Sequence, residues 1–225
     1  MAPTSQPLRI VVLVSGNGSN LQAILDAAAA GAIPARIAAV ISNRADAFAL
    51  ERARRAGVDT CTLNHREYAD RRSFDQALQQ RIDGYHPQLL VLAGFMRILT
   101  PEFVQHYRGR MLNIHPSLLP AYRGLDTHAR ALAAGAGRHG ASVHFVTDEL
   151  DGGPVVLQAE VPVHANDSPE SLAARVLAQE HRMYPLAIRW FAEGRLRLEG
   201  ERVVLDGRAL TAPERLSAET LEARR

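Results

Sequence analysis

The chain has 225 residues and 47% of them are hydrophobic, which is enough for one globular α/β domain with a substantial core. Its 26 basic residues are all arginine and nearly balance 24 acidic ones, and they are scattered rather than gathered in a stripe with aromatic residues. A nucleic-acid partner is therefore not expected, and the absence of lysine excludes Schiff-base chemistry and a P-loop lysine.

The single cysteine, Cys61, excludes an internal disulfide and is typical of a reducing compartment, so we expect a cytoplasmic protein without a signal peptide. The longest uncharged apolar run, residues 89–96, is too short to cross a bilayer. The histidines are too irregularly spaced to indicate a metal site, and no metal is expected. Without a heptad seam or a large apolar stripe, we expect a monomer or weak homodimer that acts on small molecules.

In the first half of the chain, strand-like apolar runs alternate with helical patterns. Residues 8–15 form a continuous apolar run, as in a strand that is buried on both faces. Thr100-Pro101 indicates a helix start, because proline is favoured in the first turn. The alternation predicts an α/β fold whose N-terminal half is a Rossmann-like parallel sheet with helices on both faces. The expected strands are 8–15, 36–42, 58–63, 88–94 and 110–115, and the expected helices are 20–31, 46–56, 66–84 and a short one from 101.

The second half has a different pattern, which predicts that the sheet continues as a mixed sheet. Residues 116–140 are rich in proline, glycine and alanine, so we expect a mobile loop with a short helix near 127–134. Ser168-Pro169-Glu170 opens a long helix that ends near Glu193. The remaining expected elements are antiparallel or mixed strands at 141–147 and 154–163, a small β-hairpin at 195–199 and 202–205, and a polar, loosely ordered tail at 209–225.

A glycine-rich segment, Ser15-Gly16-Asn17-Gly18-Ser19-Asn20, joins the first strand to the first helix. Exposed amides at a helix N-terminus attract an anion, and glycines let the backbone approach it. Leu21 replaces the third glycine of a dinucleotide fingerprint, and the second strand ends in Ser42-Asn43 instead of an acidic residue. The segment therefore favours a phosphomonoester over NAD. The alternative is a tight turn in which Ser19 or Asn20 caps the helix.

Three polar residues near strand ends form a candidate catalytic set. Asn113 and His115 lie two residues apart, and Asp151 lies in a glycine-flanked acidic turn. An amide can donate to an oxyanion, an imidazole can move a proton, and a carboxylate can orient the imidazolium, which together suit acyl transfer to an amine. The alternatives are a core histidine and a solvated turn.

Glu180 is the second unusual carboxylate, because it shares one helix face with apolar residues at a spacing of four. Burial of a carboxylate there is costly unless it is paired or used. We consider ligand contact and an ion pair with Arg175 or Arg182. In addition, residues 94–99 follow a strand and could line a pocket for a flat heterocycle, or belong to the core.

Several motifs together resemble one enzyme family. They are SGNGSN near the N-terminus, VLAGFMRIL, LNIHPSLLP, DELDGG and the helix around Gln179-Glu180-His181. The chain resembles, from Ile10 to about residue 208, the phosphoribosylglycinamide formyltransferases within the folate-dependent formyltransferase superfamily. The resemblance implies that a formyl group moves from 10-formyltetrahydrofolate to the amine of glycinamide ribonucleotide in purine synthesis.

The resemblance also implies site residues and a division of one domain, 1–225, into a phosphate-binding half at 8–109 and a catalytic and folate-binding half at 110–208. Asn113, His115 and Asp151 would be catalytic. The ribonucleotide phosphate would bind Gly18, Ser19 and Asn20, and its ribose would bind Glu180. The folate would contact Arg71 (with Arg66 and Arg72 as alternatives), Met96, Arg97, Ile98, Leu99, Asn113, Asp148, Glu149 and Leu150.

One loop departs from the family pattern, because Arg123 and Asp126 stand where many relatives have proline and histidine. A role for position 126 is therefore in doubt. Three rivals remain. A formyltetrahydrofolate deformylase passes formyl to water and carries an N-terminal domain, whereas seven residues precede the first strand here. A methionyl-tRNA formyltransferase carries a C-terminal RNA-binding barrel, and a non-catalytic sensor would need the glycine-rich segment alone.

Overall fold

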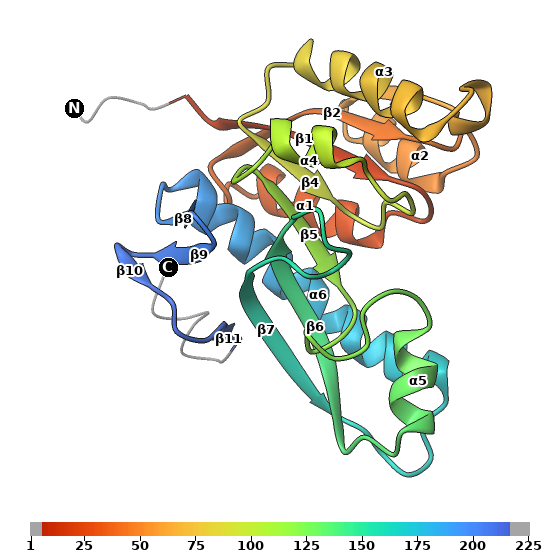
Figure 1. The fold of residues 1–225 in the computed structure, drawn as a ribbon, viewed down its shortest axis with the longest axis vertical. Coiled ribbons are helices and arrows are strands. Elements are labelled where there is room, and N and C mark those ends of the chain that lie inside the picture. Colours follow the sequence, from red (N-terminus) through yellow and green to blue (C-terminus); the bar gives the residue numbers. More distant parts are fainter. Residues whose placement is uncertain (1–5, 217–225) are drawn as a thin grey trace.

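The computed structural model describes residues 6–216, in which one eight-stranded sheet runs through both halves of the chain (Figure 1). The strand order is β3-β2-β1-β4-β5-β6-β7-β11, and a separate three-stranded sheet has the order β10-β9-β8. The strands are β1 Leu8–Val14, β2 Ala35–Ser42, β3 Asp59–Thr62, β4 Leu89–Leu92, β5 Met111–His115, β6 Arg138–Phe145, β7 Val155–Pro162, β8 Leu196–Glu199, β9 Arg202–Leu205, β10 Arg208–Ala209 and β11 Glu214–Arg215. The helices are α1 Ser19–Ala29, α2 Phe48–Arg55, α3 Arg71–Asp83, α4 Pro101–His106, α5 Thr127–Ala133 and α6 Pro169–Ala192, with a 3-10 turn, η1, at His65–Glu67.

Strands β1 to β5 are parallel, whereas β6 is antiparallel to both β5 and β7. The fold class expected from the sequence is therefore confirmed: a parallel sheet continues into a mixed one, with a long C-terminal helix and a small hairpin. The strand order reverses between β1 and β4, because β2 and β3 lie on one side and β5 on the other. In open α/β sheets, ligands bind at the carboxyl ends of the strands beside such a reversal.

The core lies on both faces of the sheet, because β1 is covered on either side. Ile10, Val12 and Val14 point into a cluster that includes residues of α1, α2 and α6. Val11 and Leu13 point into a second cluster with residues of α3 and α4. A strand that is buried on two faces needs apolar residues at every position, and this explains the continuous apolar run seen in the sequence.

Helix α6 ties the two halves of the sheet together. Ser168 caps its N-terminus by accepting a hydrogen bond from the Ser171 N–H, with Pro169 in the first turn. Further along, the hydroxyl of the fully buried Tyr184 lies 2.8 Å from the Leu92 carbonyl and 3.0 Å from the Leu112 carbonyl. One side chain of α6 therefore fixes the helix against both β4 and β5, the two strands that lead into the candidate site.

Three elements differ from the sequence prediction. The helix expected at 66–84 begins at Arg71, because Asp70 and Ser73 form a capping box there and only η1 precedes it. Strand β6 begins at Arg138 instead of 141, so the proline-rich loop is shorter than expected. Part of the expected tail is β-structure, since Glu214–Arg215 pairs with β7. Residues 217–225 of that tail lie outside the described residues.

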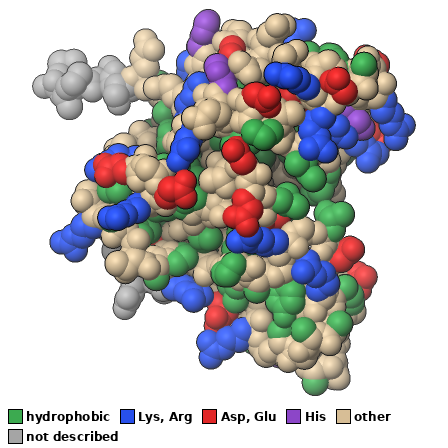
Figure 2. Space-filling view, viewed as in Figure 1, with side chains coloured by type: hydrophobic (Ala, Val, Ile, Leu, Met, Phe, Trp, Pro, Cys, Tyr) green, Lys and Arg blue, Asp and Glu red, His purple; other side chains and the backbone are tan. Residues whose placement is uncertain are grey.

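The surface shows two features that bear on function. On the face shown in Figure 2, arginine and carboxylate side chains are interspersed, and a notch with apolar side chains on its sides lies at the right. Among residues 6–216, five large apolar side chains are exposed, and all but Phe48 come from segments near the carboxyl ends of β4 and β5 or from the 148–151 turn: Met96, Ile98, Leu125 and Leu150. Within residues 6–216, no helix is long and apolar enough to cross a membrane.

Candidate active site

The glycine-rich segment after β1 forms the N-terminus of α1, and Gly18 is its N-cap residue with φ 76°. A Cβ at Gly18 would lie 2.5 Å from the Ala49 Cβ and 2.8 Å from the Ala49 Cα, so no other residue fits without a shift. Because Gly18 has no side chain, no side chain caps the helix. The alternative in which Ser19 or Asn20 caps α1 is therefore wrong, and the first-turn N–H groups are left for another acceptor.

The side chain of Asn20 points to α6 instead. Its Nδ2 donates a hydrogen bond of 2.7 Å to Oε2 of Glu180, which is 6% exposed. Burial raises the pKa of the Glu180 carboxyl, although the hydrogen bond from Asn20 works in the opposite direction. Neither arginine considered from the sequence pairs with Glu180, because Arg175 binds Asp167 and Arg182 binds Gln179. The carboxylate is thus buried beside the glycine-rich segment with a neutral partner.

A hydrogen-bond network that the sequence did not reveal links three strand ends. The Ser15 hydroxyl donates to Oδ1 of Asn43 at 2.5 Å and accepts from the Met96 N–H at 2.8 Å. Ser15, Asn43 and Met96 follow β1, β2 and β4. The network fixes the segment after β4 against the glycine-rich segment. The polar residues Ser15 and Asn43, directly after β1 and β2, were the available signal.

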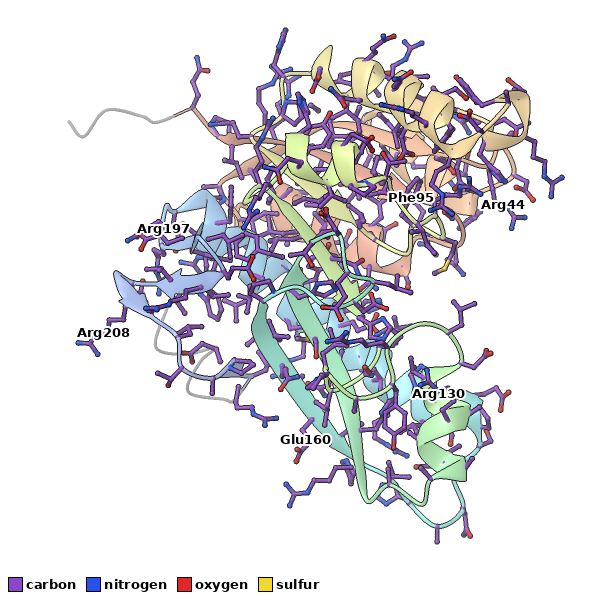
Figure 3. All side chains as sticks on the ribbon, in the orientation of Figure 1. Arg44, Phe95, Arg130, Glu160, Arg197 and Arg208 are labelled. Carbon is purple, nitrogen blue, oxygen red and sulfur yellow. The ribbon has the colours of Figure 1, made fainter. Side chains whose placement is uncertain are left out.

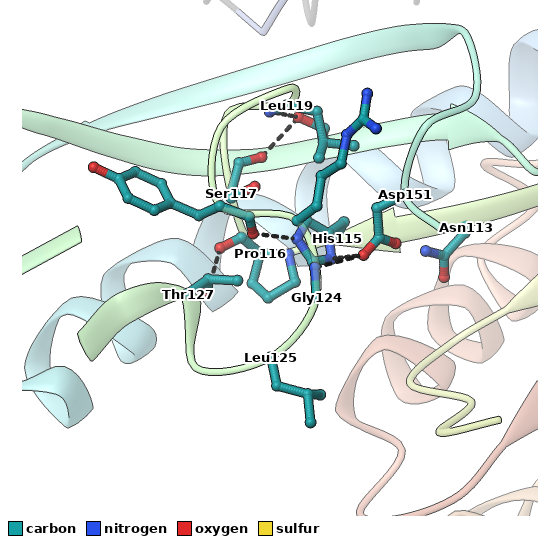
Figure 4. Close-up of polar contacts among 12 residues, drawn as sticks. Asn113, His115, Pro116, Ser117, Leu119, Gly124, Leu125, Thr127 and Asp151 are labelled. Carbon is teal, nitrogen blue, oxygen red and sulfur yellow. Dashed lines mark hydrogen bonds and ion pairs between the residues drawn. The ribbon is translucent and has the colours of Figure 1, made fainter. Parts of the chain in front are cut away.

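Asn113, His115 and Asp151 meet at the carboxyl end of β5 (Figure 4). Nδ1 of His115 lies 3.4 Å from Oδ2 of Asp151, and Nε2 of His115 donates to the Tyr122 carbonyl at 3.0 Å. Oδ2 of Asp151 also accepts the Gly124 N–H at 2.9 Å. Both the His115 and Asp151 side chains are more than 90% buried. An imidazole with an acceptor at each nitrogen is suited to carry a positive charge.

His144 is a fourth polar residue in this cluster, and sequence reasoning missed its role. It lies on β6 directly opposite Asn113 on β5, with its Nε2 3.0 Å from the Asn113 Nδ2 and 3.8 Å from Oδ1 of Asp151. In the sequence it was one of several irregularly spaced histidines. Its proximity depends on the antiparallel register of β5 and β6, which hydrophobic periodicity alone does not define.

The loop at 116–126 covers His115. Besides the contacts of Tyr122 and Gly124, the Arg123 guanidinium forms a short ion pair with Glu149, which belongs to the acidic turn. Arg130 of α5 supports the loop by donating to the Arg123 and Leu125 carbonyls. Asp126 is the N-cap residue of α5 but makes no capping hydrogen bond with its side chain, and its φ of 56° is one that aspartate tolerates.

A cavity of about 100 Å³ lies between the segment after β4 and the acidic turn. It reaches the catalytic cluster at Asn113, His144 and Asp151. Seven of the predicted folate-binding residues line it: Arg97, Ile98, Leu99, Asn113, Asp148, Glu149 and Leu150. Its remaining lining residues are Asp151 and six that were not predicted as folate contacts: Leu92, Phe95, Val104, His144, Val146 and Thr147.

Two of the predicted folate-binding residues do not line the cavity. Met96 lies at its outer edge with 66% of its surface exposed. Arg71, at the N-terminus of α3, acts together with Arg97 on the buried carboxyl of Asp75, whose pKa is raised by burial and lowered by both arginines. The structure therefore brings Arg71 and Arg97 to the same side of the site. In Figure 3, Phe95 of this half and Arg130 of α5 lie on the same side of the molecule.

Comparison with known proteins gives consistent relatives. The family model described as formyl transferase matches residues 8–188. The chain is 59% identical over 203 residues to the phosphoribosylglycinamide formyltransferase of Escherichia coli (strain K12), which covers 90% of this chain and 96% of that protein. The same-named protein of Haemophilus influenzae is 50% identical over 202 residues, with 90% and 95% covered.

The chain belongs to the formyl transferase family. A solved structure of the phosphoribosylglycinamide formyltransferase of Coxiella burnetii, in complex with CHES, is 53% identical and has a TM-score of 0.90, covering 94% of this chain and all of that chain. The family resemblance read from the motifs is thereby confirmed, and the protein is an enzyme of the formyltransferase class.

The formyltransferase has its candidate groups at one edge of the sheet. The glycine-rich segment follows β1, the cavity wall follows β4, and Asn113 and His115 end β5, so three neighbouring strands present them together. Within the described part of the chain, no group of three or more His, Cys, Asp or Glu is placed to hold a metal ion. The chemistry available at this edge is hydrogen bonding, proton transfer and charge stabilisation by side chains and helix N-terminal amides.

Proposed function

We propose that this formyltransferase moves the formyl group of 10-formyltetrahydrofolate to the amine of N1-(5-phospho-D-ribosyl)glycinamide, a step of purine synthesis in the cytoplasm. The names of relatives at 50% and 59% identity support this acceptor. The observation that carries the proposal is the position of Asn113, His115 and Asp151 beside an uncapped helix N-terminus on one sheet edge. We propose that residues 1–225 act as one domain in this reaction.

The phosphate of the ribonucleotide would bind at the start of α1. The N–H groups around Gly18, Ser19 and Asn20 lack a side-chain cap, and the helix dipole favours an anion there. The ribose hydroxyls would donate to the buried carboxylate of Glu180, next to the phosphate segment. Oδ1 of Asn20 is also buried and has no partner among the described residues, so it can accept a further hydrogen bond.

The folate would bind from the opposite side of the catalytic cluster. Its pterin ring suits the cavity between Arg97–Leu99 and Asp148–Leu150, which both apolar and charged residues line. Its carboxylates would meet Arg71 and Arg97, since guanidinium groups match carboxylates geometrically. Met96 would contact the folate from the exposed rim of the cavity.

The 116–126 loop and the acidic turn are joined beside the catalytic cluster. The Arg123–Glu149 ion pair and the Gly124–Asp151 hydrogen bond make this connection. We propose that these two segments separate when the folate enters and that the Tyr122 carbonyl then leaves Nε2 of His115 to the substrate.

The chemical step needs no enzyme nucleophile. The substrate amine attacks the formyl carbon, a new C–N bond forms, and the formyl oxygen becomes an oxyanion. Asn113 and protonated His115 donate hydrogen bonds to this oxyanion. The intermediate then collapses, the bond to N10 of the folate breaks, and N10 receives the proton that the amine loses. Asp151 keeps His115 charged and helps a water molecule carry that proton.

A formyl-transfer assay tests the proposal directly. The purified protein is mixed with 10-formyltetrahydrofolate, and folate release is followed spectroscopically with and without the ribonucleotide. We expect release only when the ribonucleotide is present. Release without it would identify a deformylase, which passes formyl to water. Binding of the ribonucleotide without any release would indicate a non-catalytic sensor and would overturn the proposed reaction.

A further inference from the structure

His144 is the buried titratable group of the site to which the mechanism above gives no task. It is 2% exposed, lines the cavity, and stands opposite Asn113 across the β5–β6 pairing. Its two ring nitrogens both have partners, Asn113 Nδ2 at 3.0 Å and the Phe145 carbonyl at 2.9 Å. One of these two contacts is therefore made to a residue of the proposed catalytic set.

The partners of His144 define where its proton lies. A carbonyl oxygen can only accept, so Nδ1 must carry the proton that is donated to Phe145. In the neutral ring Nε2 is then unprotonated and accepts a hydrogen bond from Nδ2 of Asn113. The side-chain amide of Asn113 can adopt two orientations that exchange its oxygen and its NH2 group. The contact with His144 selects the orientation in which the NH2 group points toward His144.

We propose that His144 is a positioning residue that holds the amide of Asn113 in the orientation that stabilises the formyl oxyanion. One N–H of Asn113 is bound by Nε2 of His144, and the other remains for the oxyanion. The inference rests on the proposed formyl transfer, and it adds a specific task for a histidine on β6. His144 acts through Asn113 and does not itself touch the reacting atoms.

The positioning depends on a neutral His144. Three ionisable groups face its ring: Asp151, with its Oδ1 3.8 Å from Nε2, and the side chains of His115 and Arg123. Burial is the largest influence and lowers the pKa of His144, His115 and Arg123 lower it further, and Asp151 raises it. A protonated Nε2 would donate to Oδ1 of Asn113 and reverse the amide, and it would attract Asp151 away from His115.

Two substitutions separate this role from simple packing. His144→Leu removes the acceptor but keeps an apolar side chain, so we expect kcat to fall on the order of 10- to 100-fold, with the KM of both substrates within about twofold. His144→Gln places an amide oxygen near the position of Nε2, so we expect kcat within about fivefold of wild type. His106→Leu, at an exposed histidine on α4, is the matched control and should leave kcat unchanged.

A double-mutant cycle with Asn113→Ala tests whether His144 acts through Asn113. If it does, His144→Leu causes no further loss of kcat in the Asn113→Ala background, because the amide that it orients is absent. A full additional loss there would overturn the proposal. So would unchanged kcat in His144→Leu, or equal losses in His144→Leu and His144→Gln.

A second measurement does not depend on activity. Nitrogen-15 NMR of the wild-type protein at pH 7 should give His144 the pattern of a neutral ring with its proton on Nδ1, identified by loss of the signals in His144→Gln. A proton on Nε2 or a charged ring would overturn the inference. If the wild type transfers no formyl group to the ribonucleotide, the proposed function fails, whereas the NMR result still decides the state of His144.

Discussion

In the function proposed above, the two ends of the site recognise charge in different ways. At the glycine-rich segment, the binding groups are backbone amides at the start of α1, and their positions follow from a chain conformation that only Gly18 permits. At the end of β5, the working groups are side chains, and each is held by another side chain or loop. Backbone shape therefore determines binding at the first end, while hydrogen-bond partners determine chemistry at the second.

The two carboxylates of the site show the same contrast. Glu180 is buried against the neutral amide of Asn20, so burial raises its pKa and its charge is costly. Asp151 instead contacts the His115 imidazole and accepts the Gly124 N–H. We therefore expect changes at Glu180 to affect the binding of the ribonucleotide and protein stability, and changes at Asp151 to affect turnover.

Asp151→Asn should have the largest effect, because it tests the catalytic end. Without the negative charge, His115 has no counter-ion and the proton path loses its carboxylate. We expect kcat to fall about a thousandfold, comparable to losses at other enzyme carboxylates that orient a histidine. The KM of the ribonucleotide should change less than about threefold, because Asp151 does not belong to the phosphate end. Steady-state kinetics with each substrate varied gives both values.

Asp46→Asn provides the control for this experiment, because Asp46 forms an exposed ion pair with Arg44 outside the site. It should leave both constants unchanged. Near-normal kcat in Asp151→Asn, with the control also normal, would contradict the catalytic role and remove the contrast between the two ends.

Gly18→Ala should affect the other end. An alanine at φ 76° is strained, and its Cβ would overlap Ala49, so the loop must shift. We expect the KM of the ribonucleotide to rise on the order of tenfold or more, while kcat at saturation falls much less. Gly31→Ala is a matched control, because Gly31 has φ 68° but nothing lies within 4 Å of the position that its methyl group would take.

A comparison of Gly18→Ala with Gly31→Ala separates the effect of the clash with Ala49 from the strain of an alanine at positive φ. Gly31→Ala should cost only the strain of a left-handed alanine, about 1–2 kcal/mol of unfolding free energy, with normal KM. Equal KM values in Gly18→Ala and wild type would show that the phosphate does not depend on this loop conformation.

Glu180→Gln should stabilise the protein and weaken binding. Because the pKa of Glu180 is raised in the folded protein, the folded state holds its proton at pH values where the unfolded state has lost it. The contribution of Glu180 to stability is therefore fully present below about 4.5 and is lost as the pH rises through the raised value. Glutamine keeps an acceptor for Asn20 but cannot ionise, so Glu180→Gln does not lose stability as the pH rises.

The measurement is the unfolding free energy of wild type and Glu180→Gln between pH 4 and pH 8. The advantage of the variant should grow with pH and then level off, while the KM of the ribonucleotide rises roughly tenfold through the lost carboxylate. Glu160→Gln on β7 is a suitable control, since Glu160 forms its ion pair with Arg138 away from the site. A pH-independent difference would contradict the buried-charge interpretation.

Much of the fold could be predicted because its causes are local. The apolar run of β1, the Thr100-Pro101 helix start and the Ser168 cap each act within a few residues, and all three elements were found. The start of α3 was misplaced because the Asp70–Ser73 capping box competes with several other polar residues nearby. Strand β11 was missed because two residues carry no periodicity, and its partner β7 is distant in sequence.

The same distinction between local and long-range causes applies to the candidate site. The glycine-rich segment and the Asn113, His115 pair are short sequence patterns, so they could be proposed without a structure. The partners could not: the Asn20–Glu180 contact spans 160 residues, and the Asn113–His144 contact depends on the register of an antiparallel pair. Residue types indicate what chemistry a site can perform. The tertiary structure determines which other residues hold those side chains in place.

Arg123→Ala should have the smallest effect, and it tests whether the two ends are coupled through loop closure. The Arg123–Glu149 ion pair is partly exposed, and exposed ion pairs contribute little free energy. It nevertheless joins the 116–126 loop to the acidic turn, which lines the cavity proposed for the folate. Without it, the open form should be more populated, so the Kd of a folate analogue should fall about two- to fivefold.

Hydrogen exchange of the Gly124 N–H supplies the second readout, because this amide is bound to Asp151 only while the loop is closed. Arg123→Ala should accelerate its exchange, whereas Arg138→Ala, which removes the exposed Arg138–Glu160 pair, should not. If the Kd of the analogue rises instead, Arg123 closes the loop over bound folate, and the ion pair belongs to the liganded state. The Arg123–Glu149 pair does not belong to the ribonucleotide end. The affinity of the protein for the ribonucleotide should therefore be the same in Arg123→Ala and Arg138→Ala.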